Sequence, residues 1–156
     1  MKRHDSLIPL SEHHHHALVQ CLAIARASQL SGSERRTRFQ EVAASLVKFW
    51  EIAGSTHFRE EEDVLLPALS RHVRLDQEPA IMRMLADHAQ IRAGMQDLAA
   101  ALGENRVEES QVVQLGQLLH DHVRLEENVI FPRIESLLTE QEIAALRPML
   151  TPLHPK

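Results

Sequence analysis

Several residue types are scarce in this sequence, and each shortage excludes something. The only cysteine among 156 residues, Cys21, excludes an internal disulfide and a cysteine-ligated zinc site and fits a cytoplasmic protein. Tyrosine is absent, which excludes a tyrosyl radical and a tyrosinate ligand. No apolar run approaches the roughly 18 residues of a membrane span, and the first residues lack the apolar stretch of a signal peptide. With a net charge of −5, nothing indicates a nucleic-acid or anionic-membrane partner.

Residues that favour helix dominate the chain: Leu, Ala, Glu, Gln and Arg. Apolar periodicity, with Pro and Gly at the edges, predicts long helices over about 10–30, 34–67, 79–103 and 108–138, and a short one after Thr139. Short connections make consecutive helices antiparallel. We therefore predict an all-α fold, an antiparallel up-down-up-down four-helix bundle with a short C-terminal fifth helix. The even composition predicts a single domain over residues 1–156, with its core bundle at about 10–138.

Histidine is abundant, with eleven residues, and two histidines lie in a repeated motif. The segment His57-Phe-Arg-Glu-Glu-Glu-Asp-Val-Leu-Leu-Pro matches His122-Val-Arg-Leu-Glu-Glu-Asn-Val-Ile-Phe-Pro, 65 residues later. In both, a glutamate (Glu61 or Glu126) follows the histidine by four residues, which places the pair on one helix face about 6 Å apart along the axis. Each pair also lies on the apolar stripe of its helix, and we expect Val64 and Val129 to share that stripe. A polar pair on the surface is the alternative interpretation, and the apolar stripe argues against it.

Two further histidines lie on core stripes of the other helices. His88 is in phase with Leu85, Ile91 and Met95. The first helix offers the run His13 to His16, and His14 has the most apolar residues at helical spacing, with His13 and His15 as the remaining alternatives. We choose His14 and expect its neighbours to be solvated or to donate hydrogen bonds to ligands.

Glutamates that point into a bundle core require compensation. A buried carboxylate costs several kcal/mol unless a proton, a cation or a metal offsets it. Two such glutamates, each one turn after a histidine, indicate a metal. The candidate ligands are the six residues on these stripes: His14, His57, Glu61, His88, His122 and Glu126.

In the order of these residues, and in the Leu-Leu-Pro and Ile-Phe-Pro sequences that close the motifs, the chain resembles the hemerythrin-like HHE cation-binding domain from about Leu10 to Ile134. The resemblance implies a four-helix bundle that holds two iron ions with an oxo or hydroxo bridge, one histidine per helix and two bridging glutamates. Imidazole with carboxylate suits iron, and zinc or manganese as substitutes.

The sequence departs from the oxygen-carrying hemerythrins at two positions. Arg92 stands where they have a fifth histidine, four residues after the third-helix histidine. Their last carboxylate follows its histidine by five residues, where this chain has Glu127, but helical phase favours Glu126, about 40° from His122 against about 140° for Glu127. The missing fifth histidine argues against reversible oxygen carriage. Relatives that repair iron–sulfur centres carry an N-terminal cysteine pair, which is absent here.

We therefore predict a cytoplasmic di-iron protein that binds or senses a small ligand such as O2, NO or peroxide. The alternatives are an iron-handling or oxidant-reducing enzyme, for iron-centre repair or for peroxide or NO reduction, and a bundle that metal only stabilises. The sequence shows no acid–base residue beyond the ligands, so we name no catalytic residue. The sequence does not identify a protein partner. We expect His72, His120 and the acidic residues Glu60, Glu62 and Asp63 to be solvated.

Overall fold

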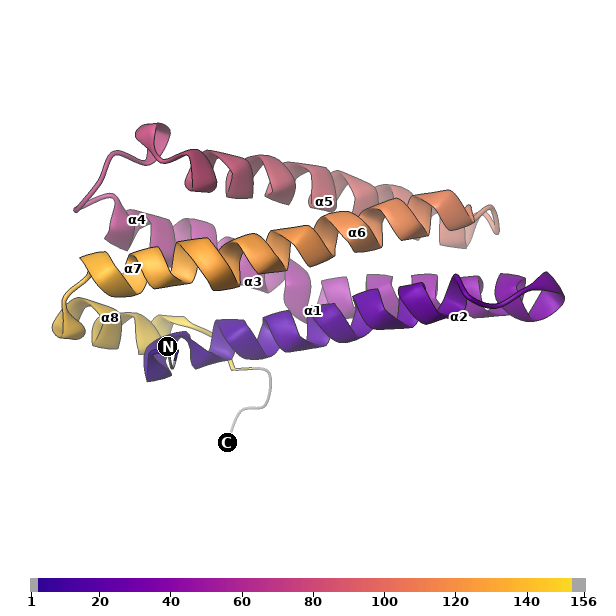
Figure 1. The fold of residues 1–156 in the computed structure, drawn as a ribbon, viewed down its shortest axis with the longest axis horizontal. Coiled ribbons are helices and arrows are strands. Elements are labelled where there is room, and N and C mark those ends of the chain that lie inside the picture. Colours follow the sequence, from indigo (N-terminus) through magenta and orange to yellow (C-terminus); the bar gives the residue numbers. More distant parts are fainter. Residues whose placement is uncertain (1–2, 153–156) are drawn as a thin grey trace.

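The first half of the chain is a helical hairpin whose second arm is interrupted twice. The computed structural model describes residues 3–152. After a 3-10 turn at Asp5–Leu7, α1 (Ile8–Ala27) runs to a tight loop at the far end of the molecule (Figure 1). The returning arm consists of five consecutive segments: α2 (Gly32–Phe49), a π-helical turn (Trp50–Gly54), α3 (Ser55–Glu60), a second π turn (Glu61–Leu65) and α4 (Leu66–Leu69).

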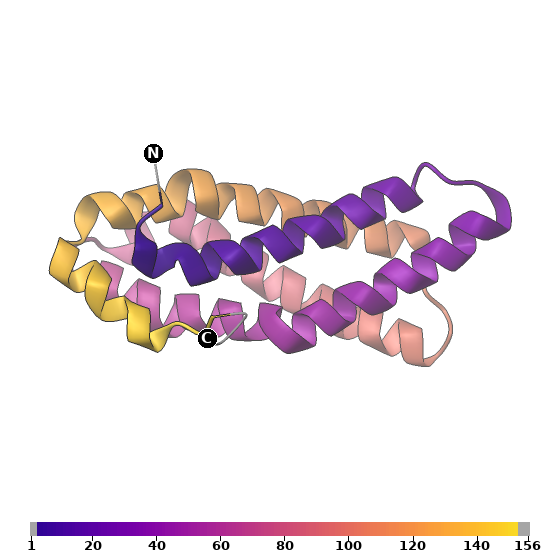
Figure 2. The ribbon, with the colours of Figure 1, turned by 90° about the horizontal axis from the view of Figure 1, so that it is seen from below.

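The second half repeats this plan. A 3-10 turn at Leu75–Gln77 leads into α5 (Pro79–Gly103), and the returning arm consists of α6 (Glu109–Leu125), a π turn (Glu126–Ile130) and α7 (Phe131–Leu137). Finally, α8 (Glu140–Leu146) and a 3-10 turn (Arg147–Met149) fold back along the end of the bundle that carries the N-terminus (Figures 1 and 2).

This architecture confirms the predicted antiparallel four-helix bundle with a short fifth helix. The boundaries of α5 agree with the prediction, since Pro79 takes its first position and Gly103 its last. The capping box at α8 is also present, because the Thr139 hydroxyl accepts from the Glu142 backbone and the Glu142 carboxylate accepts from the Thr139 backbone. Of the predicted domain, residues 1, 2 and 153–156 lie outside the described residues. Among residues 3–152, no helix is both long and apolar enough to cross a membrane.

The hydrophobic interior consists of two clusters separated by a polar layer. One cluster fills the end where α1 meets α2, and includes Ile24, Phe39 and Met95. The other fills the end covered by α8, and includes Leu10 and Phe131. Every long arm passes from one cluster to the other. The polar layer between the clusters is where the candidate ligands lie.

The two π turns that begin at Glu61 and Glu126 shift the phase of the residues after them. A π turn closes i→i+5 hydrogen bonds, so it holds one residue more than an α turn. Consequently Val129, predicted to share the apolar stripe of Glu126, is 46% exposed, and that prediction is wrong. Val64 is only partly buried. Each π turn ends just before a Leu-Pro or Phe-Pro pair, where proline takes the second position of the next helix and needs no hydrogen bond from its nitrogen.

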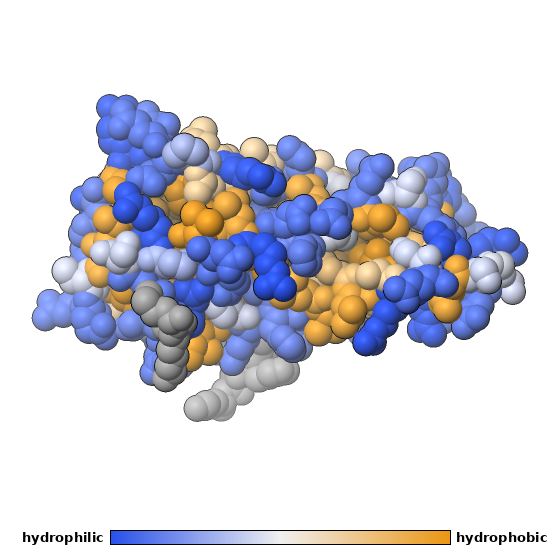
Figure 3. Space-filling view, in the orientation of Figure 1, coloured by the Kyte–Doolittle hydropathy of each residue, from blue (hydrophilic) through white to orange (hydrophobic). Residues whose placement is uncertain are grey.

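The outer surface is a mixture of polar and apolar side chains (Figure 3). A groove between α1 and α6 has apolar residues at its rim, including the half-exposed Leu22 and Val113. Cys21 lies in this groove, and its thiol donates a hydrogen bond to the carbonyl oxygen of Gly116 at 3.3 Å. Burial raises the pKa of the Cys21 thiol to about 11, so the group is a protonated thiol at neutral pH.

Candidate metal centre

Each long arm of the bundle contributes one histidine to the polar layer. These are His14 from α1, His57 from α3, His88 from α5 and His122 from α6. The two glutamates, Glu61 and Glu126, are the first residues of the two π turns. All six predicted residues are at most 4% exposed. The structure therefore brings the whole predicted set together in the core.

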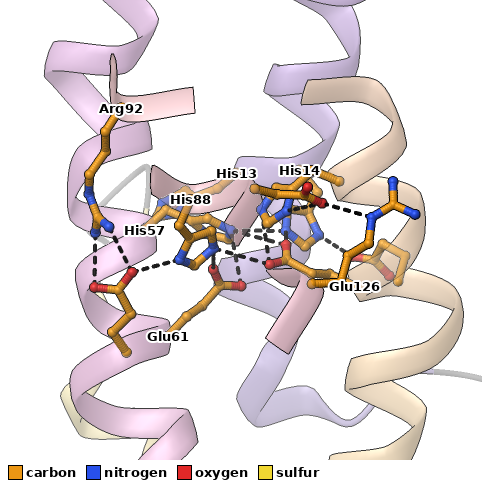
Figure 4. A network of polar contacts seen from close by, with 12 residues as sticks. His13, His14, His57, Glu61, His88, Arg92 and Glu126 are labelled. Carbon is orange, nitrogen blue, oxygen red and sulfur yellow. Dashed lines mark hydrogen bonds and ion pairs between the residues drawn. The ribbon is translucent and has the colours of Figure 1, made fainter. Parts of the chain in front are cut away.

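The six side chains form two overlapping groups of four. One group is His14, His57, Glu61 and Glu126, and the other is His88, His122 and the same two glutamates. Within each group, one nitrogen or oxygen per residue lies within 4.8 Å of all the others. Figure 4 shows the imidazoles and both carboxylates converging on the space between the helices. Such an arrangement can hold two cations that share the two carboxylates.

Unpartnered polar atoms show that a cation fits this space. Both oxygens of Glu61, one oxygen of Glu126 and both nitrogens of His122 are buried without a hydrogen-bond partner. Yet His122 Nε2 lies 3.0 Å from Glu126 Oε1, and His14 Nε2 lies 2.8 Å from Glu126 Oε2. These atoms lie at hydrogen-bond distance, yet Glu126 Oε2 and His122 Nε2 make no hydrogen bond. Because a buried, unpaired carboxylate is costly, a bound metal accounts for the arrangement.

In two histidines the outer nitrogen, Nδ1, is hydrogen-bonded to a carboxylate outside the cluster. His14 Nδ1 lies 2.7 Å from Glu127 Oε1, and His88 Nδ1 lies 2.7 Å from Glu62 Oε1. A carboxylate only accepts, so each Nδ1 is the donor. In the neutral imidazole, Nε2 then carries the lone pair, and Nε2 is the nitrogen that faces the bridging glutamates.

The other two histidines have different outer neighbours. His57 Nδ1 lies 3.2 Å from Nδ1 of His13, which is itself buried. Burial, with the nearby His57 and His14, lowers the pKa of His13 to about 4, so its imidazole is neutral and can accept from His57. His122 Nδ1 has Asp87 Oδ2 as its neighbour, at the longer distance of 3.8 Å.

Charges within the layer compensate one another. Burial would raise the pKa of Glu126, but the neighbouring imidazoles of His122, His14 and His57 outweigh it and hold this pKa well below its ordinary value. For Glu127, burial likewise acts upward, while hydrogen bonds from His14, Ser11 and Arg3 lower the pKa to about 2. Both carboxylates are therefore ionised at neutral pH, as metal binding requires.

In the structure Glu126 lies among the clustered residues, and Glu127 lies outside them beside His14 Nδ1. Two expectations about the acidic residues are wrong. Glu62 is not a solvated side chain, because it accepts from His88 and from Arg92. Glu60 is buried and accepts from the backbone nitrogen of Thr151 at 2.8 Å. Asp63 is exposed, as expected.

Three further histidines of the described chain, His72, His120 and His15, lie outside the centre. His72 is exposed and lies 2.9 Å from the Glu142 carboxylate, and His120 is partly exposed beside Asp121. Of the run in α1, His15 is exposed. Arg92, at the position of the fifth histidine of the oxygen carriers, extends to Glu62 and makes no contact with the bridging carboxylates (Figure 4).

Sequence reasoning missed the outer partners Glu62 and Asp87 and did not distinguish His13 among its neighbours. One signal was available for Glu62. Both copies of the motif have a second glutamate directly after the first, at Glu62 and Glu127, and both of these bond the outer nitrogen of a histidine from the other helix pair. No comparable pattern marks Asp87.

A comparison with curated proteins finds no match to this chain. The family model of the hemerythrin HHE cation binding domain, in contrast, matches residues 7–134, which is most of the chain and includes all six clustered residues. With four buried histidines and two shared glutamates inside a four-helix bundle, the chain belongs to the hemerythrin HHE cation-binding domain family.

Proposed function

We propose that the chain binds two iron ions in this layer. His14 and His57 would hold one ion, His88 and His122 the other, and Glu61 and Glu126 would bridge them. The observation that carries the proposal is the pair of overlapping four-residue groups with two carboxylates in common. Imidazole nitrogen with carboxylate oxygen is a donor set that suits iron, and family membership supports a cation at this place.

The protein contributes four ligands to each ion, which leaves room for a small ligand. An octahedral iron has six positions, so about two remain beyond the protein donors. When bound, iron would supply a ferrous–ferric redox change and an attachment point for O2, NO or peroxide. The residues themselves exclude bulk solvent, since all six are almost fully buried.

A small enclosed cavity lies against the His14 and His57 side of the layer. Its lining includes both of these histidines, together with Trp50 and Gly54. The accessible lining is apolar, and the volume of about 10 Å³ is the size that admits one water-sized molecule. An apolar cavity of this size favours an uncharged diatomic molecule, O2 or NO, over an anionic ligand.

We therefore propose that the chain binds or senses O2 or NO, with peroxide as a less suitable ligand, because hydrogen peroxide is polar and larger than a diatomic molecule and the accessible lining is apolar. His13 is the one titratable side chain in the lining besides His14 and His57. Burial and the neighbouring His57 and His14 lower the pKa of His13 to about 4, so its imidazole carries no extra proton at neutral pH. The cavity thus supports ligand binding better than turnover.

The test is metal content and reactivity of protein purified from iron-replete cells. We expect close to two iron ions per chain, a near-ultraviolet absorption band in the ferric form, and stoichiometric reaction of the ferrous form with NO. One tightly bound zinc and no visible or near-ultraviolet band would refute the di-iron proposal. Many turnovers of peroxide by the reduced protein would instead support an enzyme.

A further inference from the structure

A chain of contacts leads from the outer nitrogen of His88, Nδ1, to an arginine. His88 donates to Glu62, and the Glu62 carboxylate accepts from both terminal nitrogens of Arg92, at 2.8 and 3.0 Å. The guanidinium also lies 5.5 Å from the centre of the Phe58 ring, and that ring stacks on the His88 imidazole at 3.8 Å between centroids and 12° between planes. We name Arg92, Glu62 and Phe58 the His88 clamp; Figure 4 labels Arg92 and His88.

The same set of parts surrounds His14. Its Nδ1 donates to Glu127, whose other oxygen accepts from Arg3 at 2.7 Å. Arg3 lies 5.0 Å from the centre of the Phe131 ring, and Phe131 stacks on His14 at 5.1 Å and 17°. We name Arg3, Glu127 and Phe131 the His14 clamp.

The two clamps share an equivalent carboxylate of the repeated motif but differ in the origin of their arginine and aromatic residue. In each, the carboxylate is the residue after a bridging glutamate, but it grips a histidine of the other helix pair. The arginines are not equivalent by sequence, because Arg3 precedes the first helix and Arg92 lies within α5. The aromatic residues also differ, since Phe58 precedes its bridging glutamate and Phe131 follows the other. Because non-equivalent arginines and phenylalanines complete the same arrangement, we expect the two clamps to have the same function.

We infer that Arg92 and Arg3 are positioning residues for the metal centre, each serving one of the two metal positions. The inference rests on the proposed function. Arginine holds the carboxylate by charge-assisted hydrogen bonds, and the carboxylate fixes the histidine proton on Nδ1. The stacked ring fixes the plane of the imidazole. The clamp thereby directs Nε2 at its ion. The affinity for each ion is set separately, at the His14 position by Arg3 and at the His88 position by Arg92.

An ordinary structural ion pair predicts a different result. Arg92 and Glu62 are about one third and one quarter exposed, and pairs of that exposure contribute little to stability. If the pairs only brace the surface, their removal leaves metal affinity unchanged. If they position ligands, removal lowers affinity by about 10- to 100-fold, which is typical for partners behind a metal-bound histidine.

The experiment is an anaerobic titration with ferrous iron against a competing chelator. The variants are Glu62→Gln and Arg92→Met for one clamp, and Glu127→Gln and Arg3→Met for the other. Arg74→Met is the matched control, since Arg74 holds Asp76 through two nitrogens on the surface without a histidine behind it. Arg92→Lys keeps the charge and loses the two-pronged contact, so its affinity should fall between those of wild type and Arg92→Met.

We expect wild type and Arg74→Met to bind two ions tightly, and each clamp variant to keep one tight ion and weaken the other. In the iron-57 Mössbauer spectrum, variants of one clamp should alter one of the two ferrous signals, and variants of the other clamp the second signal. Circular dichroism and melting temperature of the metal-free variants show that they are folded.

Two outcomes overturn the inference. Wild type with two ions and clamp variants with unchanged affinities and spectra would show that the arginines only brace the surface. Equal weakening of both ions by every variant would show that the clamps do not act on separate positions. A wild type that binds fewer than two ions would instead refute the proposed function, and the clamps with it.

Discussion

The two proposed metal positions draw on one repeated motif, yet their surroundings differ. On the His88 and His122 side, both histidines have a carboxylate neighbour, Glu62 and Asp87. On the His14 and His57 side, Glu127 is the partner of His14, but His57 contacts the neutral imidazole of His13. The apolar cavity also lies on this second side.

This difference teaches that a sequence repeat does not make equivalent sites. A carboxylate behind a histidine raises the basicity of the metal-bound nitrogen, and a neutral imidazole does so less. One carboxylate lies behind the histidines beside the cavity, and two lie near those of the other position, although only Glu62 is within hydrogen-bond distance of its histidine. The side that can admit a ligand thus has fewer outer carboxylates, and the predictions below break or sharpen that contrast.

Removing a bridging carboxylate should remove both metal positions, and with them the difference between the two sides, because Glu61 and Glu126 belong to both four-residue groups. We expect Glu61→Ala and Glu126→Ala each to lose both iron ions, as measured by metal analysis after gel filtration. His72→Ala and His120→Ala, outside the layer, serve as controls and should keep two ions. One tight ion retained in either glutamate variant would show that the carboxylates are not shared.

Stripping the metal should destabilise both sides together. Metal that binds the folded chain alone adds roughly 4 kcal/mol at a thousandfold excess over its dissociation constant, which corresponds to a fall in melting temperature on the order of 10 °C on removal. Thermal unfolding before and after chelation measures this change. An unchanged melting temperature would contradict a metal site inside the folded core.

The metal-free protein should lose stability as the pH rises. Burial lowers the pKa of His57 and His88, but the carboxylates of Glu61 and Glu126 outweigh it and raise these values to about 10 and about 9. A raised histidine pKa contributes stability that is complete below about 6.5 and is lost as the pH passes the folded value. We therefore expect the melting temperature of chelated protein to fall between pH 7 and 10.

The metal-loaded protein is the control for this pH series. Metal replaces the protons on the imidazoles, so its melting temperature should change less over the same range. A chelated protein that becomes more stable toward pH 10 would mean that the imidazoles are not paired with the bridging carboxylates.

The smallest expected effect concerns the cavity. A Cβ added at Gly54 would lie 2.6 Å from Trp50 Cε3, so Gly54→Ala must move the indole that lines the cavity. We expect a several-fold change in the rate of NO reaction with the ferrous protein, measured by stopped flow, and unchanged iron content. Gly94→Ala is the matched control, because its Cβ would meet Leu115 Cδ1 at 2.8 Å outside the cavity lining. Equal rates of NO reaction in the two variants would show that the cavity does not control access of the ligand.

Periodicity could predict the bundle and the cluster because it reports which face of a helix is buried. His14, His88 and Glu126 all share a face with core residues, and that is enough to place them in the same layer. It does not report which residue of another helix lies nearby. Glu62 is rotated by about 100° from Glu61 and therefore resembled a solvated residue, while its partner His88 lies 26 residues away in α5.

The π turns also escaped prediction, since their hydrogen bonds follow no residue pattern that apolar spacing reveals. Val129 shows the effect of this omission. If the helix is assumed to continue as a regular α-helix through Glu126, Val129 is assigned to the buried face, but the π turn shifts it by one residue and leaves it exposed. The prolines Pro67 and Pro132 were visible, but their role at the start of a resumed helix depends on the turn before them.

The π turns at Glu61 and Glu126 divide the packing of the bundle at the layer of candidate ligands. One extra residue in a helix rotates everything beyond it by roughly 100°, so two arms change their packing register where they cross from one hydrophobic cluster to the other. The two clusters are thus separate blocks, each with its own interlocking side chains, connected through the ligands. Evolution could repack the block around Phe39 or the block around Phe131 independently, provided that the histidines and glutamates between them kept their places.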